Sequence, residues 1–132
     1  MHLTQKQIEE ILAKKPENRY KYFIKTVAAQ EEVWGLADEE GWLMLEVEGE
    51  EQDALAVFPN STFAEIFQKA ADFGDMHVEV LDLSEFMEWL DDMETEGLRV
   101  AVFPTPNFQS AVMRPTVVIE DFEKEFEKEK GE

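Results

Sequence analysis

Two histidines, His2 and His77, carry the only side chains whose ordinary pKa lies close to neutral pH, so acid–base catalysis would most readily begin with them. Nucleophilic catalysis needs a Ser, Thr or Cys beside such a base, and a carboxylate usually orients the base. The sequence contains no cysteine, and neither histidine lies in a recognised nucleophile motif. We therefore interpret His77 as an exposed residue on the polar face of a strand, and we predict no catalytic residues.

Carboxylates could also transfer protons or bind metal ions, and their densest group is Asp91-Asp92-x-Glu94-x-Glu96. These residues fall on the outer face and at the end of a predicted helix whose inner face is apolar. Acidic groups near a helix C-terminus oppose the helix dipole at a cost of about 0.3–1 kcal/mol. Because these acidic residues are present despite this cost, we interpret them as evidence that the charges have a role in recognition.

Two acidic loops, Asp38-Glu39-Glu40-Gly41 and Glu48-Gly49-Glu50-Glu51-Gln52, lack the alternating oxygen ligands of a calcium-binding EF-hand. The six glycines are scattered singly, so the sequence has no glycine-rich loop to cradle a phosphate group. Without cysteine, zinc and iron–sulfur sites that use thiolates are excluded. The sequence thus predicts neither a metal site nor a cofactor.

The elements that would position these residues follow from the periodicity of apolar side chains. Helical spacing predicts five helices, at about 4–15, from residue 19, from residue 62, at 83–97 and at 115–130. Thr4-Gln5-Lys6-Gln7 and Thr62-Phe63-Ala64-Glu65 both fit a capping box, and Pro16 should end the first helix. We interpret residues 1–15 as an accessory N-terminal helix and residues 115–130 as an acidic C-terminal helix.

Alternating or continuous apolar runs predict six strands, at Glu32–Ala37, Trp42–Val47, Asp53–Phe58, Met76–Asp82, Leu98–Phe103 and near Val112. The first three strands should form an antiparallel meander in which Ala37 pairs with Trp42 across a four-residue loop. In this register Trp34 lies on one face of the sheet, and Trp42, Met44 and Phe58 share the other. The second face predicts an exposed aromatic patch or pocket beside acidic loops, unless helices cover both faces.

One motif occurs twice: both Val57-Phe58-Pro59 and Val102-Phe103-Pro104 end an apolar strand with Phe-Pro. Proline lacks an N–H and cannot continue a central ladder, so each strand should end there. The two strands could simply be well terminated. Alternatively, their ends lie side by side and shape one groove.

The net charge of −19 is unevenly distributed along the 132 residues. Residues 1–30 carry +3, residues 31–98 carry −20 with Lys69 as their single basic residue, and residues 99–132 carry −2. Such a surface repels nucleic acid and anionic membranes, and it favours a basic partner. No run approaches the roughly 20 apolar residues of a membrane span, and the N-terminus lacks a signal-peptide pattern, so we expect a cytoplasmic protein.

An ordered set of short motifs resembles a known family. The set comprises Arg19-Tyr20-x-Tyr22-Phe23, Glu32-Val33-Trp34-Gly35-Leu36, Gly41-Trp42, Val57-Phe58-Pro59 with Phe63-Ala64, Phe86-x-x-Trp89-Leu90 and Val100-x-Val102-Phe103-Pro104. It is similar, over about residues 19–130, to the bacterial domain-of-unknown-function family numbered 2750. The resemblance implies one α+β domain in a bacterial cytoplasm and assigns no catalytic residues.

We therefore expect a single α+β domain over residues 1–132, with a mixed or mainly antiparallel sheet of five to six strands and helices packed on it. We predict a non-enzymatic interaction domain that binds a basic protein, of the inhibitor, immunity-type or nucleic-acid-mimic class. The alternative is a small-ligand-binding module or weak enzyme with an aromatic pocket. The candidate binding residues are Trp34, Trp42, Met44, Phe58, Trp89, Asp91, Asp92 and Glu94.

Overall fold

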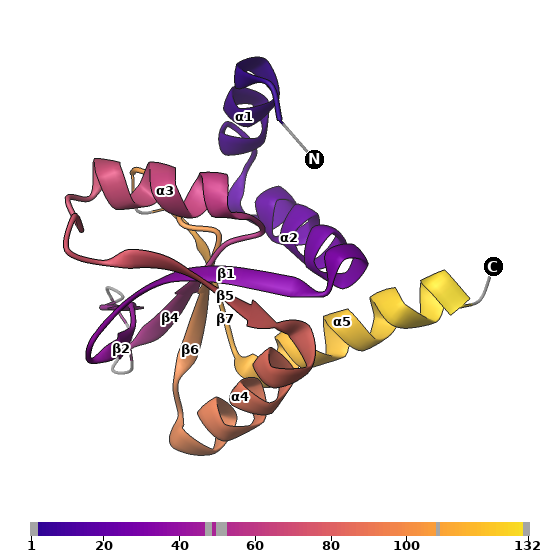
Figure 1. The fold of residues 1–132 in the computed structure, drawn as a ribbon. Helices are drawn as coiled ribbons and strands as arrows, with labels where there is room; N and C mark the ends of the chain where they lie inside the picture. Colours follow the sequence, from indigo (N-terminus) through magenta and orange to yellow (C-terminus); the bar gives the residue numbers. More distant parts are fainter. Residues whose placement is uncertain (1–2, 47–48, 50–52, 108, 131–132) are drawn as a thin grey trace.

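The computed structural model describes residues 3–46, 49, 53–107 and 109–130, which contain five helices and seven strands (Figure 1). His2, Val47 and the loop 48–52 apart from Gly49 lie outside the described residues. The helices are α1 (Gln5–Leu12), α2 (Pro16–Gln30), α3 (Ser61–Ala70), α4 (Leu83–Glu96) and α5 (Pro115–Lys130). The strands are β1 (Glu32–Asp38), β2 (Gly41–Trp42), β3 (Met44–Leu45), β4 (Ala54–Val57), β5 (His77–Asp82), β6 (Arg99–Val102) and β7 (Ala111–Met113).

The strands form two sheets, ordered β2-β1-β5 and β3-β4-β6-β7. β4 and β6 are parallel, whereas all the other pairs within the two sheets are antiparallel. The predicted α+β class with a mixed sheet is therefore confirmed. The strand number was underestimated, because the segment predicted as one strand at 42–47 contributes β2 to one sheet and β3 to the other.

The residue between β2 and β3, Leu43, connects the two sheets. Its N–H donates to the carbonyl of Leu36 at 2.8 Å, and its own carbonyl accepts from the N–H of Ala56 at 3.2 Å. Further along, β1 meets the end of β4 directly, because Trp34 and Phe58 exchange two backbone hydrogen bonds of 3.0 and 2.8 Å. The predicted meander is thus divided between two sheets, and Phe58 lies opposite Trp34 rather than beside Trp42.

The two Phe-Pro strand ends are neighbours. Val57 of β4 stands opposite Val102 of β6, and the N–H of Phe103 donates to the carbonyl of Val57 at 2.8 Å. The prediction that these ends lie side by side is confirmed. They shape no groove, however, because both phenylalanines and both prolines are buried in the core.

Arg19 of α2 binds the end of β6 through hydrogen bonds, and only 1% of its surface is exposed. Its Nε donates to the carbonyl of Phe103 at 3.3 Å, its Nη2 to that of Gln109 at 2.9 Å, and its Nη1 to that of Lys14. Phe103 has φ of 58°, a left-handed conformation that bulky residues rarely adopt. Burial lowers the pKa of Arg19 by desolvation. Arg19 therefore ties β6, the following loop and the α1–α2 connection together.

Helix ends follow the sequence with three corrections, the first of which is that α1 ends at Leu12 rather than at residue 15, before the proline predicted to end it. The Thr4 capping box is present at α1, and Gly97 ends α4 in a left-handed conformation with φ of 79°. α2 begins at Pro16 rather than near residue 19, since proline is well suited to a first helical turn. α3 is capped by Asn60, whose side chain accepts the N–H of Phe63 at 3.1 Å, so the capping box predicted at Thr62 is wrong.

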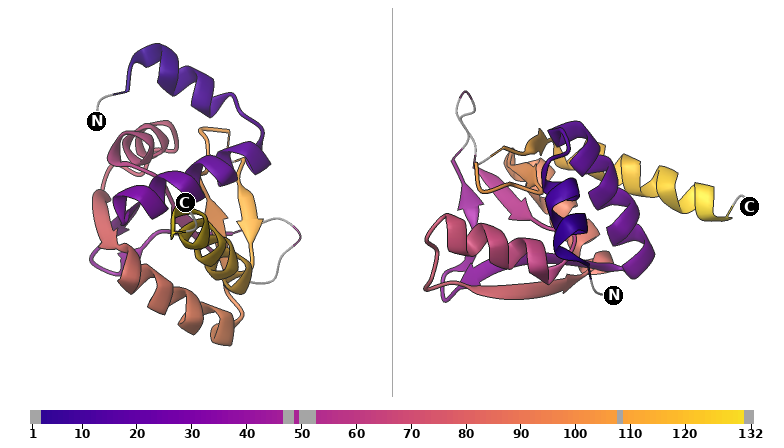
Figure 2. Two further views of the ribbon diagram at one scale, coloured as in Figure 1. Left: turned by 90° about the vertical axis from the view of Figure 1, so that its right-hand side faces the viewer. Right: turned by 90° about the horizontal axis from the view of Figure 1, so that it is seen from above.

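The helices enclose the sheets and share one hydrophobic core with them. In Figure 1, α2 and α3 lie above β1 and β5, and α4 lies below them. α1 lies at the periphery, and the C-terminal half of α5 extends beyond the sheets (Figures 1 and 2). None of the helices that the structure describes is long and apolar enough to cross a membrane.

Candidate functional site

Trp42 lies directly over Gly35 of the neighbouring strand. Trp42 pairs with Ala37, as predicted, so its side chain shares a face with residues 35 and 37 of β1. A Cβ atom at residue 35 would stand 2.3 Å from Cζ3 of the Trp42 ring and 3.3 Å from the carbonyl oxygen of Ala56. The missing side chain of Gly35 therefore makes the room that the indole occupies.

A second indole, from α4, meets the first. The rings of Trp42 and Trp89 lie edge to face, with centroids 5.2 Å apart and planes at 79°. This geometry is the favoured one for an aromatic pair, because the positive edge of one ring meets the negative face of the other. Since both indoles are only partly buried, the pair has solvent-accessible surface.

The indole pair forms one wall of an apolar pocket of about 480 Å³. The pocket is lined by Gly41, Trp42, Met44, Leu55, Trp89, Asp92, Met93 and Leu98. Among these eight described residues, Asp92 is the only one with a titratable side chain, and no nucleophile accompanies it. The pocket is therefore suited to burying an apolar or cationic group rather than to proton transfer.

The structure divides the eight candidate residues into two groups. Trp42, Met44, Trp89 and Asp92 meet at the pocket, although they come from three different elements. The other four do not line it: Trp34, Phe58, Asp91 and Glu94.

Two of the residues outside the pocket belong to the junction of the sheets. Phe58 is fully buried, and its ring lies 5.6 Å from that of Phe67. Trp34 lies opposite Val80 of the edge strand β5, and Val80 is 42% exposed. The aromatic face of β1 that carries Trp34 is therefore separate from the pocket.

Glu94 of α4 forms a contact with the start of α5. Its carboxylate accepts from Nη2 of Arg114 at 2.8 Å, and from the backbone N–H and hydroxyl of Thr116 at 3.1 and 2.6 Å. The hydrogen bonds from Thr116 and Arg114, together with the Arg114 charge, lower the pKa of Glu94 to about 2. Because Thr116 lies in the first turn of α5, this carboxylate caps that helix, whereas Asp91 remains exposed on α4.

Negative charge borders the pocket on two sides. α4 carries acidic residues and no basic residue. The β1–β2 turn contributes Asp38, Glu39 and Glu40, and it leads directly into Gly41 of the pocket wall. An apolar cavity with this border attracts a positively charged group and can desolvate its apolar portion.

A sequence model of the family described as "Protein of unknown function (DUF2750)" matches residues 20–122. The chain belongs to this family. The resemblance inferred from the motifs is thus confirmed, and the matched region includes the whole indole pocket while leaving α1 outside it. No curated protein matches the chain.

Sequence reasoning missed four of the eight residues that line this pocket: Gly41, Leu55, Met93 and Leu98. Leu55, Met93 and Leu98 carry ordinary core patterns, and nothing in their spacing distinguishes a pocket wall from the interior. Gly35 was the available signal, because an isolated glycine within a strand indicates close approach of another group.

His77 lies beside a separate, acidic depression of about 550 Å³ lined also by Asp38, Glu39, Glu40 and Asp75. His77 is exposed, as predicted, and its Nε2 lies 2.6 Å from a carboxylate oxygen of Glu79. Within the described ranges, no group of three or more His, Asp or Glu side chains is arranged to hold a metal ion.

Proposed function

We propose that this DUF2750 protein is a non-enzymatic interaction domain that binds a basic partner protein at the Trp42–Trp89 pocket. The observation that carries the proposal is the indole pair itself, set in an apolar cavity in which Asp92 is the one charged residue among the described residues of the lining. At protein interfaces, most of the binding energy typically comes from a few aromatic residues in buried pockets surrounded by a polar rim.

The chemistry favours an arginine or lysine of the partner as the inserted group. Its aliphatic stem would cover Leu55 and Met93, its cationic end would lie on an indole face, and Asp92 would accept hydrogen bonds from it. Acidic residues of α4 and the β1–β2 turn would then steer the approach of a basic surface and increase the association rate. An inhibitor, an immunity-type protein or a nucleic-acid mimic would each use these features.

The first experiment identifies and then reconstitutes the complex. Basic proteins captured from the host at low salt are purified, and their affinity for the chain is measured by titration calorimetry at several salt concentrations. We expect Trp89→Ala to weaken binding by at least about 30-fold, the equivalent of about 2 kcal/mol at an interface anchor. Asp92→Asn should weaken it and reduce its salt dependence.

Matched controls separate the pocket from general charge. Met87→Ala removes a partly buried side chain from the same helix without touching the pocket, and Glu65→Gln removes an exposed charge from α3. Both variants should bind like the wild type. If Glu65→Gln weakens binding as much as Asp92→Asn, or if Trp89→Ala binds normally, the pocket is not the interface.

The alternative function is binding of a small ligand in the same cavity. The volume of about 480 Å³ and the mainly apolar lining favour it, since pockets for small molecules commonly measure about 300–1,000 Å³. A thermal-shift screen of metabolites would support this alternative if a hit raised the melting temperature of the wild type but not that of Trp89→Ala. Stabilisation of both proteins alike would place the ligand elsewhere.

A further inference from the structure

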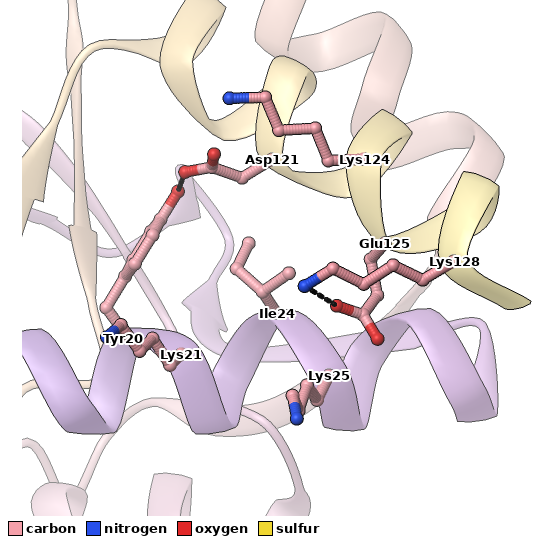
Figure 3. Close-up of a pocket in the computed structure, with 8 residues that line it drawn as sticks. All are labelled: Tyr20, Lys21, Ile24, Lys25, Asp121, Lys124, Glu125 and Lys128. Carbon is pink, nitrogen blue, oxygen red and sulfur yellow. Dashed lines mark hydrogen bonds and ion pairs between the residues drawn. The ribbon is translucent and has the colours of Figure 1, made fainter.

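A second groove lies between α2 and α5, away from the indole pocket (Figure 3). Its volume is about 410 Å³. The lining residues are Tyr20, Lys21, Ile24, Lys25, Asp121, Lys124, Glu125 and Lys128. Four of the 12 basic residues of a chain with 31 acidic ones are thus gathered in one place.

The floor of the groove is partly apolar and connects the two helices. The hydroxyl of Tyr20 donates to a carboxylate oxygen of Asp121 at 2.5 Å, which joins the two helices (Figure 3). Ile24 lies buried beside it. Burial and the Asp121 carboxylate raise the pKa of Tyr20, so the phenol keeps its proton and Asp121 keeps its donor. The Asp121 carboxylate is therefore already hydrogen-bonded to the Tyr20 hydroxyl.

The lysines are incompletely neutralised. Lys128 lies 4.0 Å from Glu125, but among the described residues Lys21, Lys25 and Lys124 make no ion pair with a carboxylate. On each helix the two lysines are four residues apart, a spacing at which like charges repel each other. Even with both lining carboxylates ionised, the groove carries a net charge of +2, from four lysines and two acids.

We propose that this groove binds a small anion that carries two or more linked phosphate groups. Among the described residues only Lys128 of these four lysines pairs with a carboxylate, whereas a diphosphate or triphosphate brings several charges within reach of ammonium groups on both helices. The surrounding negative field would repel weakly charged anions, so several simultaneous lysine contacts are needed. The site is distinct from the proposed partner surface, and either can exist without the other.

The test is titration calorimetry of the full chain at low ionic strength with inorganic tripolyphosphate, with ATP, and with citrate as a carboxylate of comparable charge. We expect saturable binding of tripolyphosphate that is at least about tenfold tighter than that of citrate, a difference equivalent to about 1.4 kcal/mol. ATP binding tighter than tripolyphosphate would assign the ligand as a nucleotide, and tighter tripolyphosphate binding would assign it as an inorganic polyphosphate.

Two double variants with the same charge change decide whether the groove is responsible. Lys21→Gln/Lys25→Gln should weaken tripolyphosphate binding at least about tenfold, as should Lys124→Gln/Lys128→Gln, since each removes two of four cationic contacts. Lys6→Gln/Lys69→Gln, which changes exposed lysines outside the groove, should leave binding unchanged. Equal losses in all three variants, citrate binding as tight as tripolyphosphate, or no saturable binding would each overturn the proposal.

Discussion

The indole of Trp42 occupies the space that a side chain on Gly35 would fill, with Cζ3 only 2.3 Å from the position of a Cβ atom. The Trp42 ring of β2 therefore packs into the space left by the absent side chain of Gly35 on the neighbouring strand β1. The contact fixes the direction of the Trp42 ring, and that direction brings it to Trp89 of α4. The shape of the candidate pocket thus depends on a glycine that does not line it.

We predict that Gly35→Ala displaces the Trp42 ring and destabilises the fold by about 1–3 kcal/mol, the usual cost of forcing a methyl group into packed space. The loss of stability should come from the steric clash between the new methyl group and the Trp42 ring. Urea denaturation measures the stability, and near-ultraviolet circular dichroism reports the indole pair. The control is Gly74→Ala, because a Cβ at residue 74 would meet no atom within 4 Å. A Gly35→Ala protein with unchanged stability and an unchanged indole signal would contradict this account.

Most elements were predictable because they are local. The capping residue Thr4, the left-handed Gly97 and the Phe-Pro strand ends each act within a few residues, and all are present where the sequence placed them. The division into two sheets was not predictable, because it depends on a hydrogen bond between Leu43 and Leu36 and on the direct pairing of Trp34 with Phe58. Periodicity reports the face that a side chain takes, but not the sheet that a strand joins.

Arg19 should be essential for stability. We predict that Arg19→Lys destabilises the protein by about 2–5 kcal/mol, because one ammonium group cannot reach the carbonyls of Phe103 and Gln109 together and buried polar groups lose their partners. Urea denaturation checks the prediction. Arg114→Lys is the matched control, since the side chain of Arg114 is 61% exposed and solvent screens its ion pair with Glu94, so the loss of stability should be much smaller. Similar losses in the two variants would show that the buried guanidinium has no special role.

The candidate site was only half predictable for a related reason. Trp42 and Met44 shared a predicted face, and Asp92 lay near Trp89 on one helix, so their types and spacing indicated recognition. Whether that helix packs against that face is a tertiary fact. The hydrogen bond from Thr116 to Glu94, 22 residues apart in the sequence, is also a tertiary contact. It engages a carboxylate that the sequence alone would assign to the exposed acidic surface.

Tyr20 gives a prediction at alkaline pH. Burial and Asp121 raise its pKa above the ordinary value of 10.0, so the stability that Tyr20 contributes is fully present below pH 10.0 and is lost as the pH rises further. The free energy of unfolding should therefore fall above pH 10.0 in the wild type. In Tyr20→Phe it should be lower at neutral pH, by about 1 kcal/mol for the lost hydrogen bond, and should fall less steeply above pH 10.0. Parallel curves for the two proteins would be evidence against this role of Tyr20.

Glu94 gives the corresponding prediction at acid pH. Because the folded protein lowers its pKa from 4.5 to about 2, the stability from this carboxylate is present above pH 4.5 and is lost as the pH falls toward 2. Glu94→Gln keeps an oxygen that can accept from Thr116 but loses the charge that attracts Arg114. We expect Glu94→Gln to be less stable than the wild type at pH 7, with a difference that shrinks steadily between pH 4.5 and 2. Urea denaturation across that range measures the difference, and Glu96→Gln, an exposed change on the same helix, serves as the control. A difference that does not change with pH would mean that the carboxylate charge contributes nothing to joining α4 to α5.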